Sequence, residues 1–382
     1  MEALAQLSQA MACHQQRQWP QARALYEAVL AAQPLHPGAL HLLGMLEHQA
    51  GCHARAAALL QQAADLNPRD PDLHDLLGCA LKGLRRWDEA LAAFDAAMAL
   101  DPARAETWCN RANAFKHMDR LEAAVSSYRR ALELDPASPL PRTNLGTVLE
   151  ALGRLDEAVA CHEAAIALAP EHPRAHHNLA FTLLLRGDYA RGWREFEWRW
   201  KYEEGDCLLR HFPQPLWLGD APVAGRTVLL HIEQGMGDMI QLARFVPQVA
   251  ALGARVVLEV HPPLRGLLQQ VPGADQVLAL GDPLPAFDLQ CPVFSLPLAL
   301  GIGLDNIPAS GGYLRAEPAR VAQWAQRLGP QVRPRIGIAW SGSTVHADDR
   351  HRSIPLAPFL AGLPEGFDYV SLQPVVREPD RP

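Results

Sequence analysis

Lysine is scarce in this chain of 382 residues. Of its 35 lysine and arginine residues, only three are lysines: Lys82, Lys116 and Lys201. Residues 202–382 therefore lack the lysine that a P-loop or a Schiff-base enzyme requires. Any phosphate contact in that half has to come from arginine, histidine, hydroxyl groups or backbone N–H groups.

The cysteines exclude two further kinds of site. Their number is odd and no two form a C-x-x-C pair; they stand at positions 13, 52, 79, 109, 161, 207 and 291. We expect reduced thiols in a cytosolic protein, with neither a disulfide framework nor a zinc site. The histidines of the N-terminal half show no metal-ligand spacing, so no metal is expected.

Long apolar runs and a positive net charge are also absent. No stretch of about 18 apolar residues occurs, so we expect no membrane span. The N-terminus, MEALAQLSQA, lacks the basic region and apolar core of a signal peptide, which favours a cytoplasmic location. A net charge of −7 argues against a nucleic-acid partner. The length predicts two or three domains at about 150 residues each.

A period of 34 residues organises the first half of the chain. Small residues recur at Ala10, Gly44, Gly78, Ala112, Gly146 and Ala180, and twelve residues later at Ala22, Ala56, Ala90, Ala124, Ala158 and Gly192. A bulky residue follows each of the second set, at Tyr26, Leu60, Phe94, Tyr128, His162 and Phe196. Prolines 34, 68, 102, 136 and 170 close five of the units. We expect two helices to approach closely at the small residues and the proline to end the second helix.

This pattern resembles six tetratricopeptide repeats over about residues 3–204, and it predicts an α-solenoid over residues 1–204. Stacked repeats of this kind form a superhelix whose concave face binds an extended peptide or protein.

Three asparagines are the candidate peptide-binding residues of this solenoid. Asn110, Asn144 and Asn178 share one position on the first helix of repeats four to six. An amide both donates to and accepts from a peptide backbone. The set resembles the asparagine ladder of O-linked N-acetylglucosamine transferases. The alternative is that asparagine is simply common at this position, and repeats two and three have Leu42 and Leu76 there.

Aromatic residues crowd the end of the last repeat, at Trp193, Phe196, Trp198, Trp200 and Tyr202. We expect them to cap the solenoid and to dock the next domain; the alternative is a platform on which sugars stack. The proline-rich residues 205–226 predict a linker along the surface.

Strand and helix patterns alternate from residue 227 onward. Apolar runs predict strands at 227–232, 254–260, 276–280 and 287–291, with helices over 239–253 and 262–273. This alternation predicts a parallel, Rossmann-like sheet over residues 227–331. A strand at 335–340, a helix at 356–363 and a strand at 368–372 predict the beginning of a second Rossmann-like domain over residues 332–382.

The loop from Glu233 to Asp238 lies where the first predicted strand turns into a helix. Ligands of open parallel sheets bind at such strand ends. Gly235 and Gly237 permit close backbone approach, but residue 240 is Ile instead of the third glycine of a dinucleotide fingerprint, which argues against an NAD enzyme. Asp238 is either a helix-capping carboxylate or a general base.

Three segments carry a resemblance to a known family. They begin at TVLLHIEQGMGD, FDLQCPVFSLPLALG and IGIAWSGSTVHADDRHRSIPL. They resemble bacterial tetratricopeptide proteins with a heptosyltransferase-like domain of the two-Rossmann GT-B class, similar to glycosyltransferase family 9. The resemblance spans about residues 185–378. It implies transfer of a sugar from a nucleotide-sugar to a protein or glycan acceptor, with no metal and no resident cofactor.

The resemblance also implies roles for individual residues. Asp238 stands where heptosyltransferases place the proposed base, and the candidate acceptor contacts are Gln234, Gly235, Gly237, Gln241 and Arg244. The candidate donor contacts are Ser341, Gly342, Ser343, Thr344, Arg350 and Arg352. Arg352 replaces the lysine of heptosyltransferases, which leaves the donor open. The alternative is a surface ion-pair loop of Asp348, Asp349, Arg350 and Arg352.

A complete second Rossmann-like domain needs roughly 130 further residues. We therefore expect the chain to be a truncated part of a longer glycosyltransferase and to be inactive alone. The alternative is a non-catalytic repeat scaffold that binds partner proteins.

Overall fold

The computed structural model describes residues 2–201, 210–308, 312–342 and 349–381. The chain forms two compact units, Met1–Gly311 and Gly312–Pro382. None of the helices in the described ranges combines the length and the apolar character that a bilayer crossing requires.

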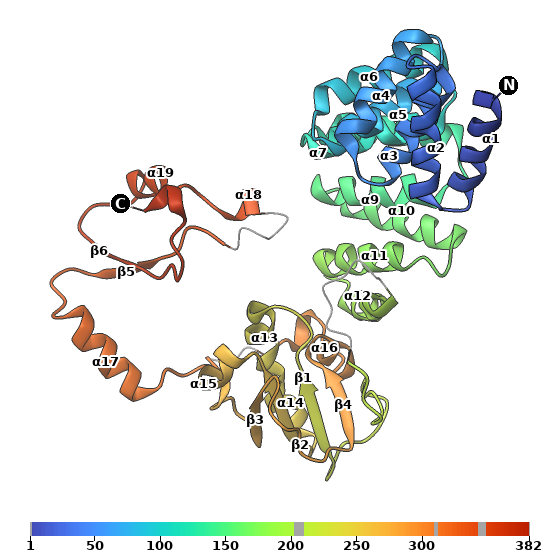
Figure 1. The fold of residues 1–382 in the computed structure, drawn as a ribbon. Helices are drawn as coiled ribbons and strands as arrows, with labels where there is room; N and C mark the ends of the chain where they lie inside the picture. The colour runs from blue at the N-terminus through green and yellow to red at the C-terminus, as the bar shows by residue number, and fades with distance from the viewer. Residues whose placement is uncertain (1, 202–209, 309–311, 343–348, 382) are drawn as a thin grey trace. The chain divides into compact units, whose positions relative to one another are not determined.

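Twelve helices make up the first part of the larger unit, and they pack in consecutive pairs (Figure 1). They are α1 (Glu2–Gln15), α2 (Trp19–Ala32), α3 (Pro37–Gln49), α4 (His53–Leu66), α5 (Pro71–Gly83), α6 (Trp87–Leu100), α7 (Ala105–His117), α8 (Leu121–Leu134), α9 (Pro139–Ala151), α10 (Leu155–Leu168), α11 (Pro173–Arg186) and α12 (Tyr189–Phe196). The predicted solenoid of six helix pairs is confirmed.

The turn inside each helix pair places one residue in the left-handed backbone region. These residues recur every 34 positions, at Arg17, Gly51, Arg85, Asp119, Gly153 and Gly187, with φ between 57° and 88°. Glycine adopts this conformation without a steric penalty, whereas a side chain makes it costly. Three of the six turns therefore carry backbone strain.

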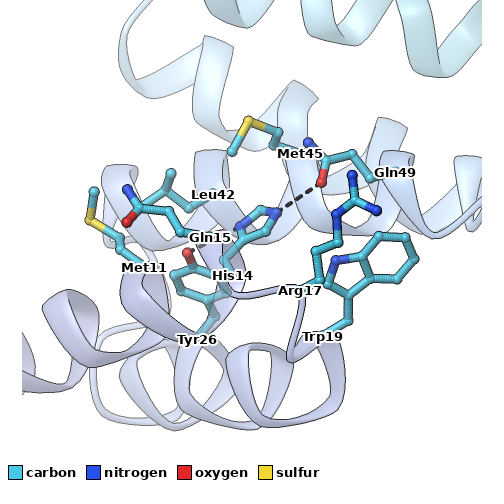
Figure 2. A pocket seen from close by; sticks show the side chains of 9 residues that line it. All are labelled: Met11, His14, Gln15, Arg17, Trp19, Tyr26, Leu42, Met45 and Gln49. Atoms are coloured by element: carbon cyan, nitrogen blue, oxygen red, sulfur yellow. Dashed lines mark hydrogen bonds between the residues drawn. The ribbon is translucent and has the colours of Figure 1, made fainter.

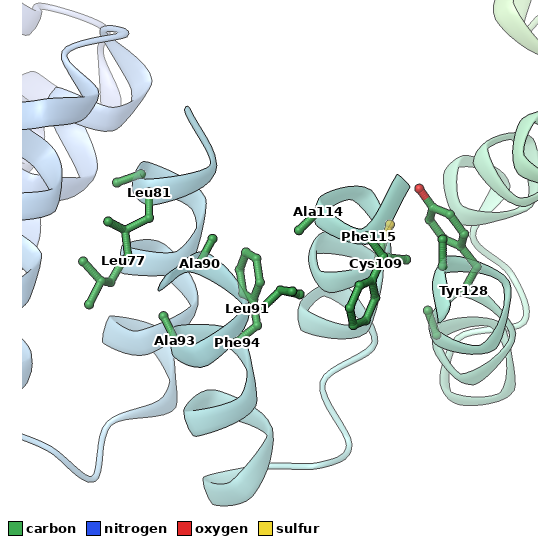
Figure 3. Close-up of a cluster of buried hydrophobic side chains, with 14 of the residues drawn as sticks. Leu77, Leu81, Ala90, Leu91, Ala93, Phe94, Cys109, Ala114, Phe115 and Tyr128 are labelled. Carbon is green, nitrogen blue, oxygen red and sulfur yellow. The ribbon is translucent and has the colours of Figure 1, made fainter. Parts of the chain in front are cut away.

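The predicted contact between small and bulky residues is also confirmed. A β-carbon built on Gly78 would lie 2.5 Å from Cε1 of Phe94, and one on Gly146 would lie 2.4 Å from Cε1 of His162. Glycine at these positions lets the two helices of a repeat approach closely. Figure 3 shows Phe94 among the buried side chains that continue from α5 to α8.

A four-stranded parallel sheet forms the rest of the larger unit. Its strands are β1 (Thr227–His231), β2 (Arg255–Val260), β3 (Gln276–Ala279) and β4 (Leu289–Pro292), in the order β3-β2-β1-β4. The four predicted strands are therefore confirmed, with small changes at their ends. The strand order changes direction between β1 and β4, which is where parallel sheets bind ligands.

The helices around this sheet are shorter than predicted. The segment expected as one helix over 239–253 is divided into α13 (Met236–Leu242), a 3-10 turn (Ala243–Phe245) and α14 (Val246–Ala251). Pro247 stands in the first turn of α14, because proline has no N–H to continue a helix. Over 262–273 only a 3-10 turn (Pro262–Leu264) and α15 (Arg265–Leu268) form. A further 3-10 turn (Val293–Ser295) and α16 (Leu296–Ala299) follow β4, and another 3-10 turn covers Leu304–Asn306.

The segment predicted as a surface linker is partly buried. Trp217 is only 1% exposed, and its backbone N–H donates to the carbonyl of Gln290 in β4 at 2.8 Å. Leu216 forms a parallel bridge with the same residue. The backbone of this segment therefore extends the sheet edge beside β4. Residues 202–209 lie outside the described part.

The smaller unit contains α17 (Pro318–Leu328), β5 (Arg335–Ile338), α18 (Asp349–Arg352), α19 (Leu356–Ala361), β6 (Asp368–Ser371) and a 3-10 turn (Glu378–Asp380). Strands β5 and β6 pair in parallel, and they correspond to the strands predicted at 335–340 and 368–372. The unit begins at Gly312, about 20 residues before the predicted boundary at 331/332. Arg335 of β5 donates to the carbonyls of Leu328 and Gly329, which ties α17 to this unit.

Candidate functional site

Side chains of successive first helices form hydrogen bonds along one face of the solenoid. Lys82 of α5 donates to the side-chain oxygen of Asn110 in α7 at 3.2 Å. Asn178 of α11 donates to the hydroxyl of Thr147 in α9 at 3.2 Å. We call this face, with its equivalent positions in the other repeats, the ladder face. It includes all three predicted asparagines, and each of them is half-buried.

The three asparagines differ in what remains available for a ligand. The side-chain oxygen of Asn110 accepts from Lys82, and its amide nitrogen lies 3.5 Å from the carboxylate of Asp75. Asn144 and Asn178 donate to the preceding repeat, at 3.5 Å to Asn113 and at 3.2 Å to Thr147. Within the described residues, the side-chain oxygens of Asn144 and Asn178 accept no hydrogen bond. These two are the asparagines with an available acceptor.

In the first two repeats, apolar and polar side chains together line a hollow that includes the ladder-face residue Leu42 (Figure 2). This hollow of about 650 Å³ is lined by Met11, His14, Gln15, Arg17, Trp19, Tyr26, Leu42, Met45 and Gln49. Leu42 takes the position of the asparagines, as the sequence indicated. His14 lies 3.0 Å from the side-chain oxygen of Gln49 and 3.4 Å from the hydroxyl of Tyr26, so it joins the two repeats.

The residues predicted to contact the acceptor lie at the carboxyl end of β1. Asp238 stands in the first turn of α13, is half-buried, and forms no hydrogen bond or ion pair with the described residues. Gly235 is the N-cap residue of this helix, and Asp238 stands three residues after it. A β-carbon on Gly235 would lie 3.2 Å from the Asp238 carboxylate, which explains why glycine suits this position.

One neighbouring residue bonds to this loop, and the other predicted acceptor residues differ in their exposure. His261, which follows β2, donates from Nε2 to the backbone carbonyl of Gln234 at 2.6 Å. Gln241 and Gly237 are exposed, and Arg244 is half-buried. The predicted acceptor residues therefore lie on one loop, on the helix α13 that follows it and, for Arg244, on the 3-10 turn after that helix.

A buried arginine, which the sequence did not single out, lies beside the carboxyl ends of β1 and β4. Arg199 lies in the 3-10 turn that follows α12 (Glu197–Lys201) and is 1% exposed. It donates to both carboxylate oxygens of Glu233, at 3.0 and 3.1 Å, and to the hydroxyl of Ser295 at 2.8 Å. Burial lowers the pKa of Arg199, but the charges of Glu233 and Glu197 outweigh it, so the net pKa is raised.

One aromatic residue beside Arg199, Phe196, docks the part with the sheet onto the solenoid, as predicted. Phe196 is buried and packs against Phe294, with ring centroids 5.6 Å apart. Trp198 stacks on His176 at 3.7 Å, and the Trp200 ring lies 4.2 Å from the Arg199 guanidinium. Because these rings contact other side chains of the protein, the contacts favour the cap over the sugar-stacking platform.

The predicted donor residues lie in the smaller unit, and the structure describes only part of them. Ser343 and Thr344 fall outside the described residues, as does the side chain of Arg350. The backbone N–H groups of Ser341 and Gly342 are taken by Gln373 and Ser353, at 3.2 and 3.1 Å. Arg352 is exposed.

Asp349 is one of the four residues of the alternative surface ion-pair loop, and Asp348 lies outside the described residues. The Asp349 carboxylate pairs with Arg377 at 2.6 Å and accepts from Ser353 at 2.6 Å. Trp340 is buried and donates to Asp380 at 3.0 Å, so it packs inside the unit. The part of the chain that the structure describes contains no group of three or more histidine, cysteine or acidic residues placed to hold a metal.

Comparison with known proteins identifies the repeats. Tetratricopeptide repeat families match residues 7–71, 71–104, 105–138 and 127–160. Protein FlbA of Caulobacter vibrioides is 25% identical over 377 residues, covering 91% of this chain. The chain spans 62% of the length of FlbA.

Solved structures of repeat proteins are similar to about half of the chain. TTC0263, a TPR protein of Thermus thermophilus, is 23% identical with a TM-score of 0.41, covering 48% of this chain and 99% of its own. MamA of Desulfovibrio magneticus RS-1 is 18% identical with a TM-score of 0.42, covering 44% and 96%. YrrB, titled a TPR protein with an unusual peptide-binding site, is 20% identical with a TM-score of 0.40, covering 46% and 90%. The helical half of this chain is thus a tetratricopeptide-repeat solenoid, an architecture suited to protein–protein interaction.

Proposed function

We propose that this chain is a protein-interaction scaffold that holds an extended segment of a partner protein along the ladder face. The supporting observation is the pair Asn144 and Asn178. The amide nitrogen of each donates to the preceding repeat, while its side-chain oxygen accepts nothing within the described residues. An acceptor oriented in this way suits a backbone N–H of an extended peptide. Asn110 contributes less, because Lys82 already occupies its oxygen.

A peptide selection tests this proposal. Random peptides of one length are passed over the immobilised chain, and the retained peptides are synthesised and titrated by fluorescence anisotropy. The double variant Asn144→Ala, Asn178→Ala removes two hydrogen bonds and is expected to weaken binding about tenfold. The matched control is Gln61→Ala on α4, where the exposed side chain bonds only to Asp65 of the same helix. Retention of no peptide, or equal binding by the double variant, contradicts the proposal.

A second candidate function is glycosyl transfer, for which Asp238 provides a specific observation. This half-buried carboxylate at the carboxyl end of β1 has no hydrogen-bonding or ionic partner within the described residues. A general base has to be available to a substrate proton in this way. The resemblance to heptosyltransferases assigns the same residue as base, and the parallel sheet is consistent with that class.

In this mechanism Asp238 takes the proton of an acceptor hydroxyl, whose oxygen attacks the anomeric carbon of a nucleotide-sugar. The nucleoside diphosphate leaves with the electrons of the broken glycosidic bond. The resemblance assigns Gln234, Gly235, Gly237, Gln241 and Arg244 to contacts with the acceptor.

The test of glycosyl transfer uses the natural gene product. Release of nucleoside diphosphate is measured over a panel of nucleotide-sugars, with cell protein as acceptor. We expect turnover in the wild type and its loss in Asp238→Asn, with Asp305→Asn on an exposed turn as the matched control. Turnover that survives in Asp238→Asn contradicts the assignment of Asp238 as the base. Absence of turnover from the wild-type protein contradicts glycosyl transfer and leaves the scaffold as the remaining proposed function.

A further inference from the structure

The helix α17 of the smaller unit has no buried residue among its eleven positions. Its three large apolar side chains, Val321, Trp324 and Leu328, are 54%, 50% and 38% exposed. Successive spacings of three and four residues place them on one face of the helix. A surface helix normally gains its stability by packing such a face against another element, so this face is suited to a partner.

The smaller unit holds this helix through its backbone instead of its side chains. Arg335 of β5 donates to the carbonyls of Leu328 and Gly329, at 2.8 and 2.9 Å. The Arg320 guanidinium lies 3.8 Å from the Glu317 carboxylate, but both side chains are largely exposed, and such pairs contribute little. The apolar face of the helix therefore remains exposed to solvent within this unit.

Arginine side chains flank the apolar face, and only one acidic residue offsets them. Residues 312–335 contain five arginines and one acidic residue, although the whole chain has a net charge of −7. Arg320 stands four positions before Trp324 and Arg327 three positions after it, so both lie beside the indole on the helix surface. The Arg327 guanidinium is 4.9 Å from the centroid of the Trp324 ring. The same surface is thus apolar and positively charged.

The charge determines which partner fits this surface. A second copy of the chain would bring the same arginines together, and the repulsion between like charges would oppose pairing. The surface of an anionic bilayer offers negative phosphates next to a hydrocarbon interior. Tryptophan is favoured at that boundary, and arginine extends its guanidinium to the head groups while its alkyl stem lies along apolar surface. Such a surface therefore matches both properties of the helix.

We infer that α17 binds the surface of a bilayer that contains anionic phospholipids and lies in its plane. Eleven residues extend about 16 Å along a helix axis, which is about half of the hydrocarbon thickness, so this helix cannot cross the bilayer. Binding of this kind scales with the buried apolar area and with the attraction to anionic lipid. No residue of the solenoid takes part, so binding does not depend on the proposed scaffold function.

Flotation of the full chain with vesicles tests this assignment. One set of vesicles is pure phosphatidylcholine, and the other contains about 30% phosphatidylglycerol, which gives it a negative surface. We expect the chain to float with the anionic vesicles and not with the neutral ones. Raising the salt concentration from about 0.1 M to about 1 M shortens the screening length and is expected to release most of the protein.

Substitutions on the helix connect flotation to α17. Trp324→Ser is expected to weaken partitioning at least about tenfold, because it removes the largest apolar side chain of the face. Arg320→Gln with Arg327→Gln is expected to weaken it about thirtyfold at low salt. The matched control is Arg129→Gln with Arg130→Gln on α8, which makes the same change in net charge at exposed positions of the solenoid. This control is expected to float as the wild type does.

A second readout locates the bound surface. Phosphatidylglycerol with brominated acyl chains quenches only those of the nine tryptophans that enter the bilayer. We expect vesicle-dependent quenching in the wild type and its loss in Trp324→Phe, which keeps an aromatic ring and should still float. Because every position of α17 is exposed, the variants on this helix should melt at the temperature of the wild type, which separates loss of binding from loss of folding.

Three outcomes overturn the assignment. Equal flotation with neutral and anionic vesicles, or flotation with neither, excludes an anionic bilayer as the partner. Flotation that survives in Trp324→Ser or in the double arginine variant of α17 places the contact elsewhere in the chain. A dimer in sedimentation velocity that Trp324→Ser abolishes would assign this face to a second copy of the chain instead.

Discussion

The guanidinium of Arg199 and the carboxylate of Glu233 form a buried two-bond ion pair, with Nε–Oε2 3.0 Å and Nη2–Oε1 3.1 Å. Arg199 ends the helical repeats, and Glu233 follows the first strand of the sheet. The same carboxylate accepts from the backbone N–H of Phe294 at 3.0 Å. The pair therefore joins the solenoid to the segments that follow β1 and β4, the two strands between which the strand order changes direction.

Removing Arg199 should be strongly destabilising. Arg199→Ala leaves the Glu233 carboxylate buried without a counter-charge, and we expect a loss of about 3–5 kcal/mol in the free energy of unfolding. Urea denaturation measures it. The exposed pair Arg191–Glu163 supplies the control, since Arg191→Ala is expected to cost less than about 1 kcal/mol. A paired replacement, Arg199→Met with Glu233→Leu, should recover most of the loss. If Arg199→Ala costs no more than the control, the pair has no part in docking.

His162 should make stability depend on pH. Its ring is fully buried against Gly146, neither ring nitrogen has a hydrogen-bond partner among the described residues, and burial lowers its pKa to about 4. Between that value and the ordinary pKa of 6.5, the unfolded chain binds a proton that the folded chain does not. Stability should therefore fall as the pH drops from about 6.5 towards 4, by about 1.4 kcal/mol for each unit of separation between the two pKa values.

The variant His162→Phe tests this assignment, because Phe94 fills the equivalent position opposite Gly78. We expect its free energy of unfolding at pH 7 to rise by about 1 kcal/mol, since two unpaired buried nitrogens are removed. Its stability should also vary less with pH than that of the wild type. Urea titrations at several pH values check both effects. Identical pH profiles for the two proteins would falsify the role of His162.

Two turns with the same backbone conformation should respond oppositely to substitution. Arg85 has φ 59° and an exposed side chain, so Arg85→Gly relieves left-handed strain. Gly153 has φ 73° with open space around it, so Gly153→Ala adds strain without a clash. We expect the first to stabilise by up to about 1 kcal/mol and the second to destabilise by about 1 kcal/mol. Thermal unfolding of both variants measures this, and shifts of the same sign would rule out the strain argument.

Adding one carbon at Gly78 should weaken the third repeat. The new β-carbon of Gly78→Ala would meet the Phe94 ring at 2.5 Å, in a core where the two helices cannot separate without losing contacts. We expect a loss of about 1–3 kcal/mol. Phe94→Leu in the same chain should restore part of it, because leucine lacks the ring atoms Cε1 and Cζ, which would lie 2.5 and 2.9 Å from the new carbon. The measurement is urea denaturation of the single and double variants. Additive losses would show that the two positions do not touch.

The helical repeats could be predicted almost completely from the sequence. Glycine or alanine at positions such as Gly78 and a bulky residue such as Phe94 sixteen positions later describe a contact within one helix pair. Such contacts are local in the chain, and they repeat, so one pattern indicates twelve helices. The left-handed turn at Arg85 was not predictable in the same way, since an arginine carries no signal for positive φ.

The candidate sites could be predicted from the sequence much less fully than the helical repeats. The sequence identified Asn144, Asn178 and Asp238 by position and resemblance, yet their availability depends on what surrounds them. Whether an amide oxygen is already satisfied, as at Asn110 but not at Asn144, follows from a lysine in the preceding repeat.

Local periodicity thus accounts for the solenoid and for the strand pattern after it, because each element is specified by residues close to it in the chain. The ion pair of Arg199 with Glu233 and the burial of Trp217 arise from contacts between segments distant in sequence. Charge and desolvation depend on every group within a few ångströms in space, whichever part of the chain supplies it. That is why folding, and not the order of residues, assigns these side chains their roles.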